Sequence, residues 1–138
     1  MKTIFEALKQ AEAQHKSVLL TITKNNGMTI AEWKLLNLLE KQINTQDKLS
    51  SDTGLDHSTL SRQLHSLNRK KMIMSESIGH NNRQLRYELT LAGSDALVAA
   101  NTQYSTFQDK VFQLWSDEEF NMLQILLNRL NKSMKKPL

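Results

Sequence analysis

Hydrophobic residues recur at helical spacing near both ends of the chain. One series runs from about Thr3 to Lys24 at intervals of three and four residues: Ile4, Leu8, Ala11, His15, Val18 and Ile22. The same intervals return over Leu91–Trp115 and over Asp117–Met134. Because an α-helix turns about 100° per residue, positions at this spacing form a stripe along one side. The pattern predicts three long amphipathic helices.

Shorter elements are predicted between these helices. Asn25-Asn26-Gly27 breaks the first helix, and Thr29 with Glu32 three residues later has the sequence of a capping box. Hydrophobic positions at helical spacing follow, so we expect a buried helix that ends near Gln42.

A helix-turn-helix pattern comes next. Thr45 is a suitable cap for a short helix that continues to about Thr53, where Gly54 ends it. Asp56 then caps a second helix, which we expect over His57–Lys70. Two short helices joined by a tight turn with a glycine are the signature of this motif.

The pattern after this helix changes to that of strands. Met72–Ile78 reads as one strand, Gly79–Asn82 has turn chemistry, and Leu85–Leu89 alternates between apolar and charged residues. Two strands around a polar tip predict a β-hairpin wing. The expected fold class is therefore mainly α (α+β), a winged helix-turn-helix core with long helices at both ends.

Composition narrows the class of protein. The chain has 138 residues, no cysteine, one proline and four glycines. The lack of cysteine excludes disulfides and zinc–thiolate or iron–sulfur sites. The sequence has neither a signal-peptide pattern nor an apolar run near the ~20 residues that span a bilayer. We expect a cytoplasmic protein without a membrane segment.

Positive charge is concentrated in the middle of the chain. The segment His57–Glu88 contains six lysine or arginine residues and two glutamates, a net charge of +4 that equals that of the whole chain. Such a segment suits a surface that faces phosphates, although a solvated face explains the charge alone equally well.

The helix expected from His57 separates its residues by chemistry. Leu60, Leu64 and Leu67 cluster on one side, which we expect to face the core. The other side and its flanks carry hydroxyl, imidazole and guanidinium groups without a carboxylate: Ser58, Thr59, Ser61, Arg62, His65 and Arg69. Side chains of these types suit the major groove of DNA, and a helix N-terminus attracts phosphate. A merely solvated face is the less favoured alternative.

Three segments together resemble the MarR family (multiple antibiotic resistance regulators). They are "TIAEWKLLNLLE", "LDHSTLSRQLHSLNRKKMI" and "NNRQLRYELTLAG". The resemblance implies six helices with a wing, a dimer with interlocked terminal helices, and wing tips that reach the minor groove. It makes Arg83 the wing arginine and places Ser58, Thr59, Ser61 and Arg62 on the recognition surface. The sequence departs from the family pattern at Asn81, where aspartate is usual, at Lys71, where glycine is usual, and at Ser75, where arginine is usual.

The three long apolar stripes predict a homodimer, because one small winged core cannot bury them all. We assign residues 1–27 and 91–138 to a helical dimerisation region and residues 28–90 to the DNA-binding region. A compact monomeric bundle is the alternative. A two-fold dimer would place two recognition helices about one DNA turn apart and read an inverted repeat.

The expected partners are double-stranded DNA, a second copy of the chain and a small aromatic or lipophilic effector, the last implied by the resemblance. We expect a repressor that the effector releases. The residues expected to bind DNA are Ser58, Thr59, Ser61, Arg62, His65, Arg69, Arg83 and Arg86.

We expect no catalytic residue, cofactor or metal, and therefore no enzyme. Asp56, His57 and Ser58 are consecutive helical residues, so they cannot form a catalytic relay. The four histidines lack the paired spacing that favours zinc. His15 lies on an apolar stripe and is interpreted as an interface histidine. Trp33, Tyr104 and Trp115 are interpreted as core aromatics, with the lining of a ligand pocket as the less favoured alternative. A winged helix that binds another regulator is the main alternative function.

Overall fold

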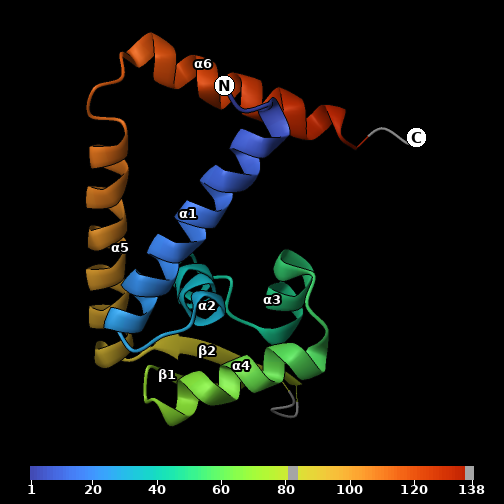
Figure 1. Ribbon diagram of the computed structural model, residues 1–138. Helices are drawn as coiled ribbons and strands as arrows, with labels where there is room; N and C mark the ends of the chain where they lie inside the picture. The colour runs from blue at the N-terminus through green and yellow to red at the C-terminus, as the bar shows by residue number, and fades with distance from the viewer. Residues whose placement is uncertain (81–83, 136–138) are drawn as a thin grey trace. The chain divides into compact units, whose positions relative to one another are not determined.

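The computed structural model describes residues 1–80 and 84–135, and over these residues it confirms the expected winged helix-turn-helix fold (Figure 1). Its elements are α1 (Ile4–Asn25), α2 (Ile30–Glu40), α3 (Gln46–Thr53), α4 (His57–Arg69), β1 (Ile73–Ile78), β2 (Gln84–Leu89), α5 (Leu91–Val111) and α6 (Asp117–Ser133). Part of the expected wing turn, Asn81 and Asn82, lies outside the described residues.

Side-chain caps fix where the helices begin. The capping boxes at Thr29 and Ser116 are both present, and in the first the Glu32 N–H donates to Thr29 Oγ1 over 3.1 Å. Thr45 and Asp56 cap α3 and α4 as expected. Thr3 forms a further capping box at the start of α1.

Two helices end earlier than the sequence pattern suggested. α2 ends at Glu40 rather than near Gln42, because Gln42 has a left-handed φ of 68° and the Ile43 N–H bonds back to the Leu38 carbonyl. α5 ends at Val111 rather than at Trp115. The chain turns there, and the Trp115 N–H donates to the Phe112 carbonyl over 3.1 Å.

The described chain divides into two compact units, Met1–Tyr104 and Ser105–Leu138. The first unit holds the hydrophobic core, where the helix-turn-helix packs on the helices beside it. Residues buried there to 4% exposure or less include Leu35, Leu36, Leu39, Leu49, Leu60, Leu64, Leu67, Ile73, Leu97 and Ala100.

The wing is an antiparallel pair with Ile73 opposite Leu89 and Ile78 opposite Gln84. β2 also contacts the segment that precedes α3: the Tyr87 N–H donates to the Asn44 carbonyl over 2.8 Å. The wing is therefore held directly against the start of the helix-turn-helix.

A polar and aromatic cluster joins α1, α2 and α5 within the first unit. His15 Nε2 lies 2.8 Å from the Tyr104 hydroxyl, and the Tyr104 ring packs edge-on against Trp33. Trp33 Nε1 donates to Asn101 Oδ1 over 2.8 Å. His15 thus has a partner within its own chain. Trp115 belongs to the other unit and packs against Phe112.

None of the helices in the described ranges has the length and hydrophobicity to cross a membrane.

Candidate nucleic-acid interface

The leucine face of α4 is turned into the core, as the sequence predicted. Leu60, Leu64 and Leu67 are 0%, 3% and 0% exposed. The opposite side is exposed to solvent and carries His57, Ser58, Ser61, Arg62, His65, Asn68 and Arg69. Thr59, on the flank of this side, is half-buried. The helix itself contains no carboxylate.

Asp56, which precedes α4, has a structural role. Asp56 Oδ1 accepts the Thr59 N–H over 2.7 Å and the Ser58 hydroxyl over 3.4 Å. Hydrogen bonds from the hydroxyl and the N–H of Thr59 lower the pKa of Asp56. The negative charge therefore caps the N-terminus of α4, where it interacts favourably with the helix dipole.

The turn between α3 and α4 fixes the angle at which α4 is presented. Gly54 has a φ of 72°, which a residue with a β-carbon adopts only with strain. The Ser50 hydroxyl donates to the Leu55 carbonyl over 2.9 Å and closes the turn.

Gln46, the first residue of α3, contacts the exposed face of α4. Its Nε2 donates to Ser61 Oγ over 2.7 Å and lies 3.4 Å from the His57 carbonyl. Sequence reasoning missed Gln46, because its position directly after a cap predicts a helix start but no contact with the next helix.

Lys70 is not a free cation. Its Nζ lies 2.7 Å from Glu32 Oε1 and donates to the Gly27 carbonyl over 3.0 Å. Burial by itself raises the pKa of Glu32, but hydrogen bonds from Lys70, the Thr29 N–H and Ser66 outweigh it and lower that pKa. The pair ties the end of α4 to the start of α2.

Arg86 also binds carboxylates of its own chain. Its guanidinium pairs with Glu76, directly opposite on β1, and its Nε lies 3.7 Å from Glu88 Oε1. The expected role of Arg86 in DNA binding stays a prediction, and its charge is neutralised in this structure.

Three cations remain available on or near α4. In the part of the chain that the structure describes, no carboxylate forms an ion pair with Arg62, Arg69 or Lys71. Arg62 Nη2 lies 3.4 Å from Thr59 Oγ1, so it is held loosely at the helix surface. Arg83, the expected wing arginine, lies outside the described residues. The interface therefore offers a compact cationic face with hydroxyl groups beside it.

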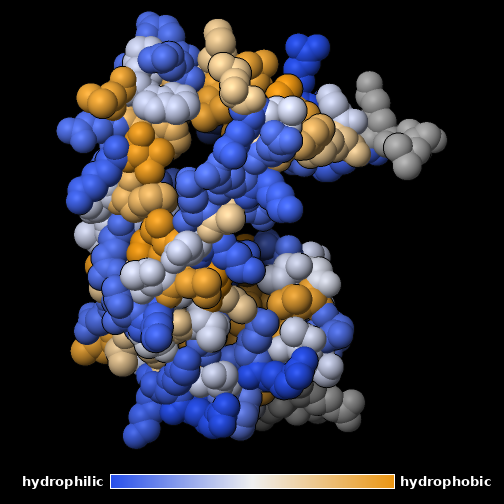
Figure 2. Space-filling model, viewed as in Figure 1, coloured by the Kyte–Doolittle hydropathy of each residue, from blue (hydrophilic) through white to orange (hydrophobic). Residues whose placement is uncertain are grey.

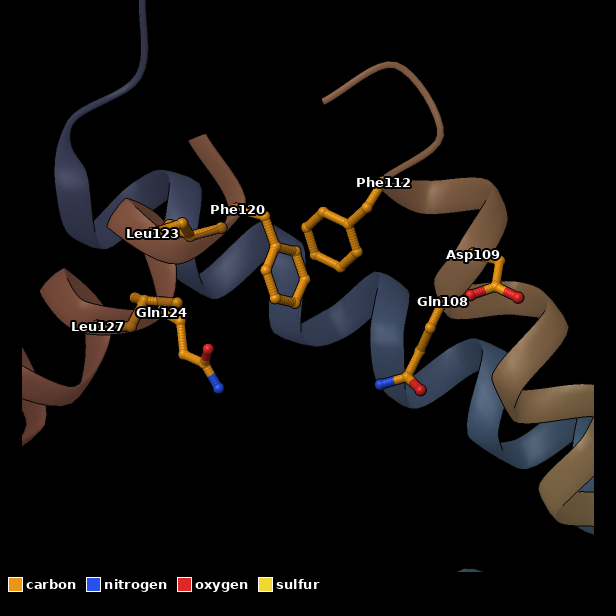
Figure 3. A pocket seen from close by; sticks show the side chains of 7 residues that line it. All are labelled: Gln108, Asp109, Phe112, Phe120, Leu123, Gln124 and Leu127. Carbon is orange, nitrogen blue, oxygen red and sulfur yellow. The ribbon is translucent and has the colours of Figure 1, made fainter. Parts of the chain in front are cut away.

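The second unit has a different character, with apolar side chains at its surface. A hollow of about 500 Å³ lies between α5 and α6, and Figure 3 shows Phe112 and Phe120 beside it, with their rings in an edge-to-face contact. Ile125 and Met122 on α6 are 66% and 62% exposed. Figure 2 shows hydrophobic side chains at the surface along α6.

No group of three acidic or histidine side chains among the described residues is arranged to hold a metal ion.

The order of elements, the tight turn and the wing define a winged helix-turn-helix protein. No protein-family model matches the sequence, and no curated protein matches it.

Solved structures with this fold include MarR and MepR. The apo form of wild-type MarR from E. coli matches with a TM-score of 0.74 and 16% sequence identity, over 94% of this chain and 97% of that one. A MepR G34K mutant from S. aureus matches with a TM-score of 0.82 and 19% identity, over 97% and 100%. The S. aureus MepR–DNA complex matches with a TM-score of 0.78 and 18% identity, over 96% and 97%. The chain therefore has the MarR winged-helix fold.

Proposed function

We propose that the protein is a DNA-binding transcriptional regulator of the MarR type, with α4 as its recognition helix. The observation that carries this proposal is the exposed face of α4, which presents Arg62, Arg69 and hydroxyl groups without a carboxylate. An ordinary solvated helix face of this length mixes both signs of charge. A face without acids suits a polyanion.

The residue types on and beside this face suit both kinds of contact that proteins make with DNA, those with base edges and those with phosphates. Arginine donates two parallel hydrogen bonds to guanine in the major groove, and short hydroxyl side chains bond to base edges. Lys71, just beyond α4, suits a phosphate, which adds affinity without sequence information. That one of the similar structures is a complex of MepR with DNA supports the proposal.

We propose further that the protein acts as a homodimer, with residues 1–27 and 91–138 as the dimerisation region. Large apolar side chains are exposed on α6, and Ile4 and Phe5 at the start of α1 are 72% and 58% exposed. Apolar side chains exposed in such number are typical of an interaction surface. Burial of this surface stabilises a dimer by about 25 cal/mol per Å². Two-fold symmetry makes an inverted repeat the expected operator.

The regulatory part of the proposal is repression relieved by a small aromatic or lipophilic effector. A ligand that binds better to a conformation with mismatched recognition helices shifts the population toward that conformation. DNA affinity then falls without direct competition for the recognition face.

Selection of bound sites from random duplex DNA tests the proposal. The purified protein is expected to enrich one sequence with two-fold symmetry and half-sites about one helical turn apart. Enrichment of no sequence, together with no salt-dependent retention of duplex DNA, would reject DNA reading and favour a winged helix that binds another protein.

A further inference from the structure

We infer that Glu76 and Glu88 restrain the DNA affinity of the protein by holding Arg86 as an internal ion pair. The inference rests on the proposed function and deepens it. Arg86 binds DNA phosphate only when the phosphate displaces these carboxylates from its guanidinium group.

Three charged side chains of the wing lie on the same face. Glu76 lies directly opposite Arg86 in the antiparallel pair, and Met74 lies directly opposite Glu88. Successive side chains of a strand point to opposite faces, so Glu76, Arg86 and Glu88 share one face of the wing. The guanidinium group pairs with both carboxylates on that face.

Arg86 lies close to the helix-turn-helix. Its backbone bridges to Thr45, the cap of α3. Gln46, which follows Thr45 in the chain, donates a hydrogen bond to Ser61 on the exposed face of α4 over 2.7 Å. Arg86 therefore lies at the junction of the wing with the helix-turn-helix, within the neighbourhood that the proposed function assigns to DNA.

Negative charge exceeds positive charge in this cluster. The three side chains carry one positive and two negative charges, so this cluster of described residues has a net charge of −1. A face with that charge repels phosphate.

The ion pairs of Arg86 are accessible to solvent. The side chains of Arg86, Glu76 and Glu88 are 41%, 53% and 54% exposed. Ion pairs this accessible to water are weak, and DNA phosphates can displace them. The restraint therefore reduces affinity modestly and does not abolish binding.

The experiment measures the affinity of the full-length protein for its selected duplex over a range of salt concentrations. Glu76→Gln is expected to tighten binding by up to about fivefold, the effect of removing one exposed ion pair. It is also expected to steepen the plot of log K against log salt by up to about 0.9, the value for one full phosphate contact, because the wild type makes this contact only in the fraction of complexes in which phosphate has displaced the carboxylates. Glu40→Gln, which removes one exposed carboxylate at the end of α2, is the control for net charge and is expected to leave the slope unchanged.

The double variant Glu76→Gln with Arg86→Gln identifies the group responsible. We expect its slope to return to the wild-type value, because the released cation is gone. A Glu76→Gln slope equal to that of the wild type, or a steeper slope that persists in the double variant, would overturn the inference while leaving the proposed function standing. Loss of salt-dependent binding in the wild type itself would overturn both.

Discussion

The carbonyl oxygen of Met72 lies so close to Gly93 that a β-carbon on the glycine would be 1.9 Å away from it. Thr90 brings the two segments together: its N–H donates to the Met72 carbonyl over 3.0 Å, and its hydroxyl donates to the Lys71 carbonyl over 2.6 Å. The Leu-Thr-x-x-Gly sequence after the wing thus fastens the first turn of α5 onto the backbone that leads into β1.

Gly93→Ala is expected to destabilise the protein by about 3 kcal/mol, because backbone must move to make room for the methyl group. Helix propensity alone gives the opposite sign, since alanine is favoured over glycine by about 1 kcal/mol inside a helix. Urea unfolding of the variant shows which of these two opposite effects on stability prevails. Ala92→Gly, at an exposed position of the same turn, is the matched control and should cost about 1 kcal/mol. An alanine variant as stable as the wild type would show that the two segments are not packed this closely.

The sequence could predict the helix starts because capping signals are local. Thr29, Thr45 and Asp56 each bond to an N–H three residues ahead, and the α4 leucines follow from helical period alone. Helix ends were harder, since Gln42 adopts a left-handed φ that its residue type does not signal.

Partners distant in sequence could not be predicted. Lys70 and Glu32 are 38 residues apart, so nothing local indicates that this lysine is neutralised. Gln46 reaches Ser61 only because the turn folds α3 against α4. Basic residues that look equivalent in the sequence therefore differ in the charge they offer to a ligand.

Lys71 occupies a backbone conformation that favours glycine. Its φ is 59°, and the Met72 N–H bonds back to the Leu67 carbonyl over 3.0 Å, as in a Schellman motif. We expect Lys71→Gly to raise the free energy of unfolding by about 1 kcal/mol, because glycine adopts this conformation without a steric cost. Lys71→Ala removes the same charge but keeps the β-carbon, so thermal unfolding should show no gain. Equal stabilisation by both variants would attribute the effect to charge instead.

The ion pair of Glu32 with Lys70 predicts a dependence of stability on pH. The pKa of Glu32 lies below its ordinary value of 4.5, so the folded state favours the charged carboxylate. Its contribution is fully present above that ordinary value and is lost as pH falls through the lower, folded-state pKa. Glu32→Gln keeps a capping-box side chain and should cost about 1–2 kcal/mol at neutral pH.

Denaturant unfolding of both proteins between pH 7 and pH 3 tests this sign. The difference between the wild type and Glu32→Gln should shrink as the solution becomes acidic. A difference that stays constant over this range would mean that the charge of Glu32 does not contribute to stability.

The exposed apolar face of α6 predicts the assembly state. We expect the wild type to sediment as a dimer and Ile125→Asp to shift it toward monomer, because a carboxylate buried in an apolar interface is costly. Asn131→Asp adds the same charge at an exposed polar position of α6 and should leave the dimer intact. DNA affinity should fall with Ile125→Asp, since each half-site is then bound separately. A wild type that sediments as a monomer at all concentrations would reject the proposed dimerisation region.

The exposed face of α4 predicts which side chain distinguishes one DNA sequence from another. Arg62 lies on the side of α4 opposite the buried Leu60 and Leu64, without a carboxylate in an ion pair with it. Arg62→Ala is expected to weaken binding to the selected operator by about 1–3 kcal/mol, the value for an arginine that reads a base. Binding to unrelated duplex DNA should weaken much less, because most of that affinity comes from phosphate contacts.

Arg129→Ala, on α6, removes the same charge away from the recognition helix and serves as the control. It should change neither the operator affinity nor the ratio of specific to non-specific binding. If Arg62→Ala and Arg129→Ala bind the operator equally well, Arg62 does not read a base. If Arg62→Ala instead weakens both kinds of DNA equally, the residue contacts phosphate, and sequence discrimination must come from other groups on the face, with Ser58 and Ser61 the next to replace.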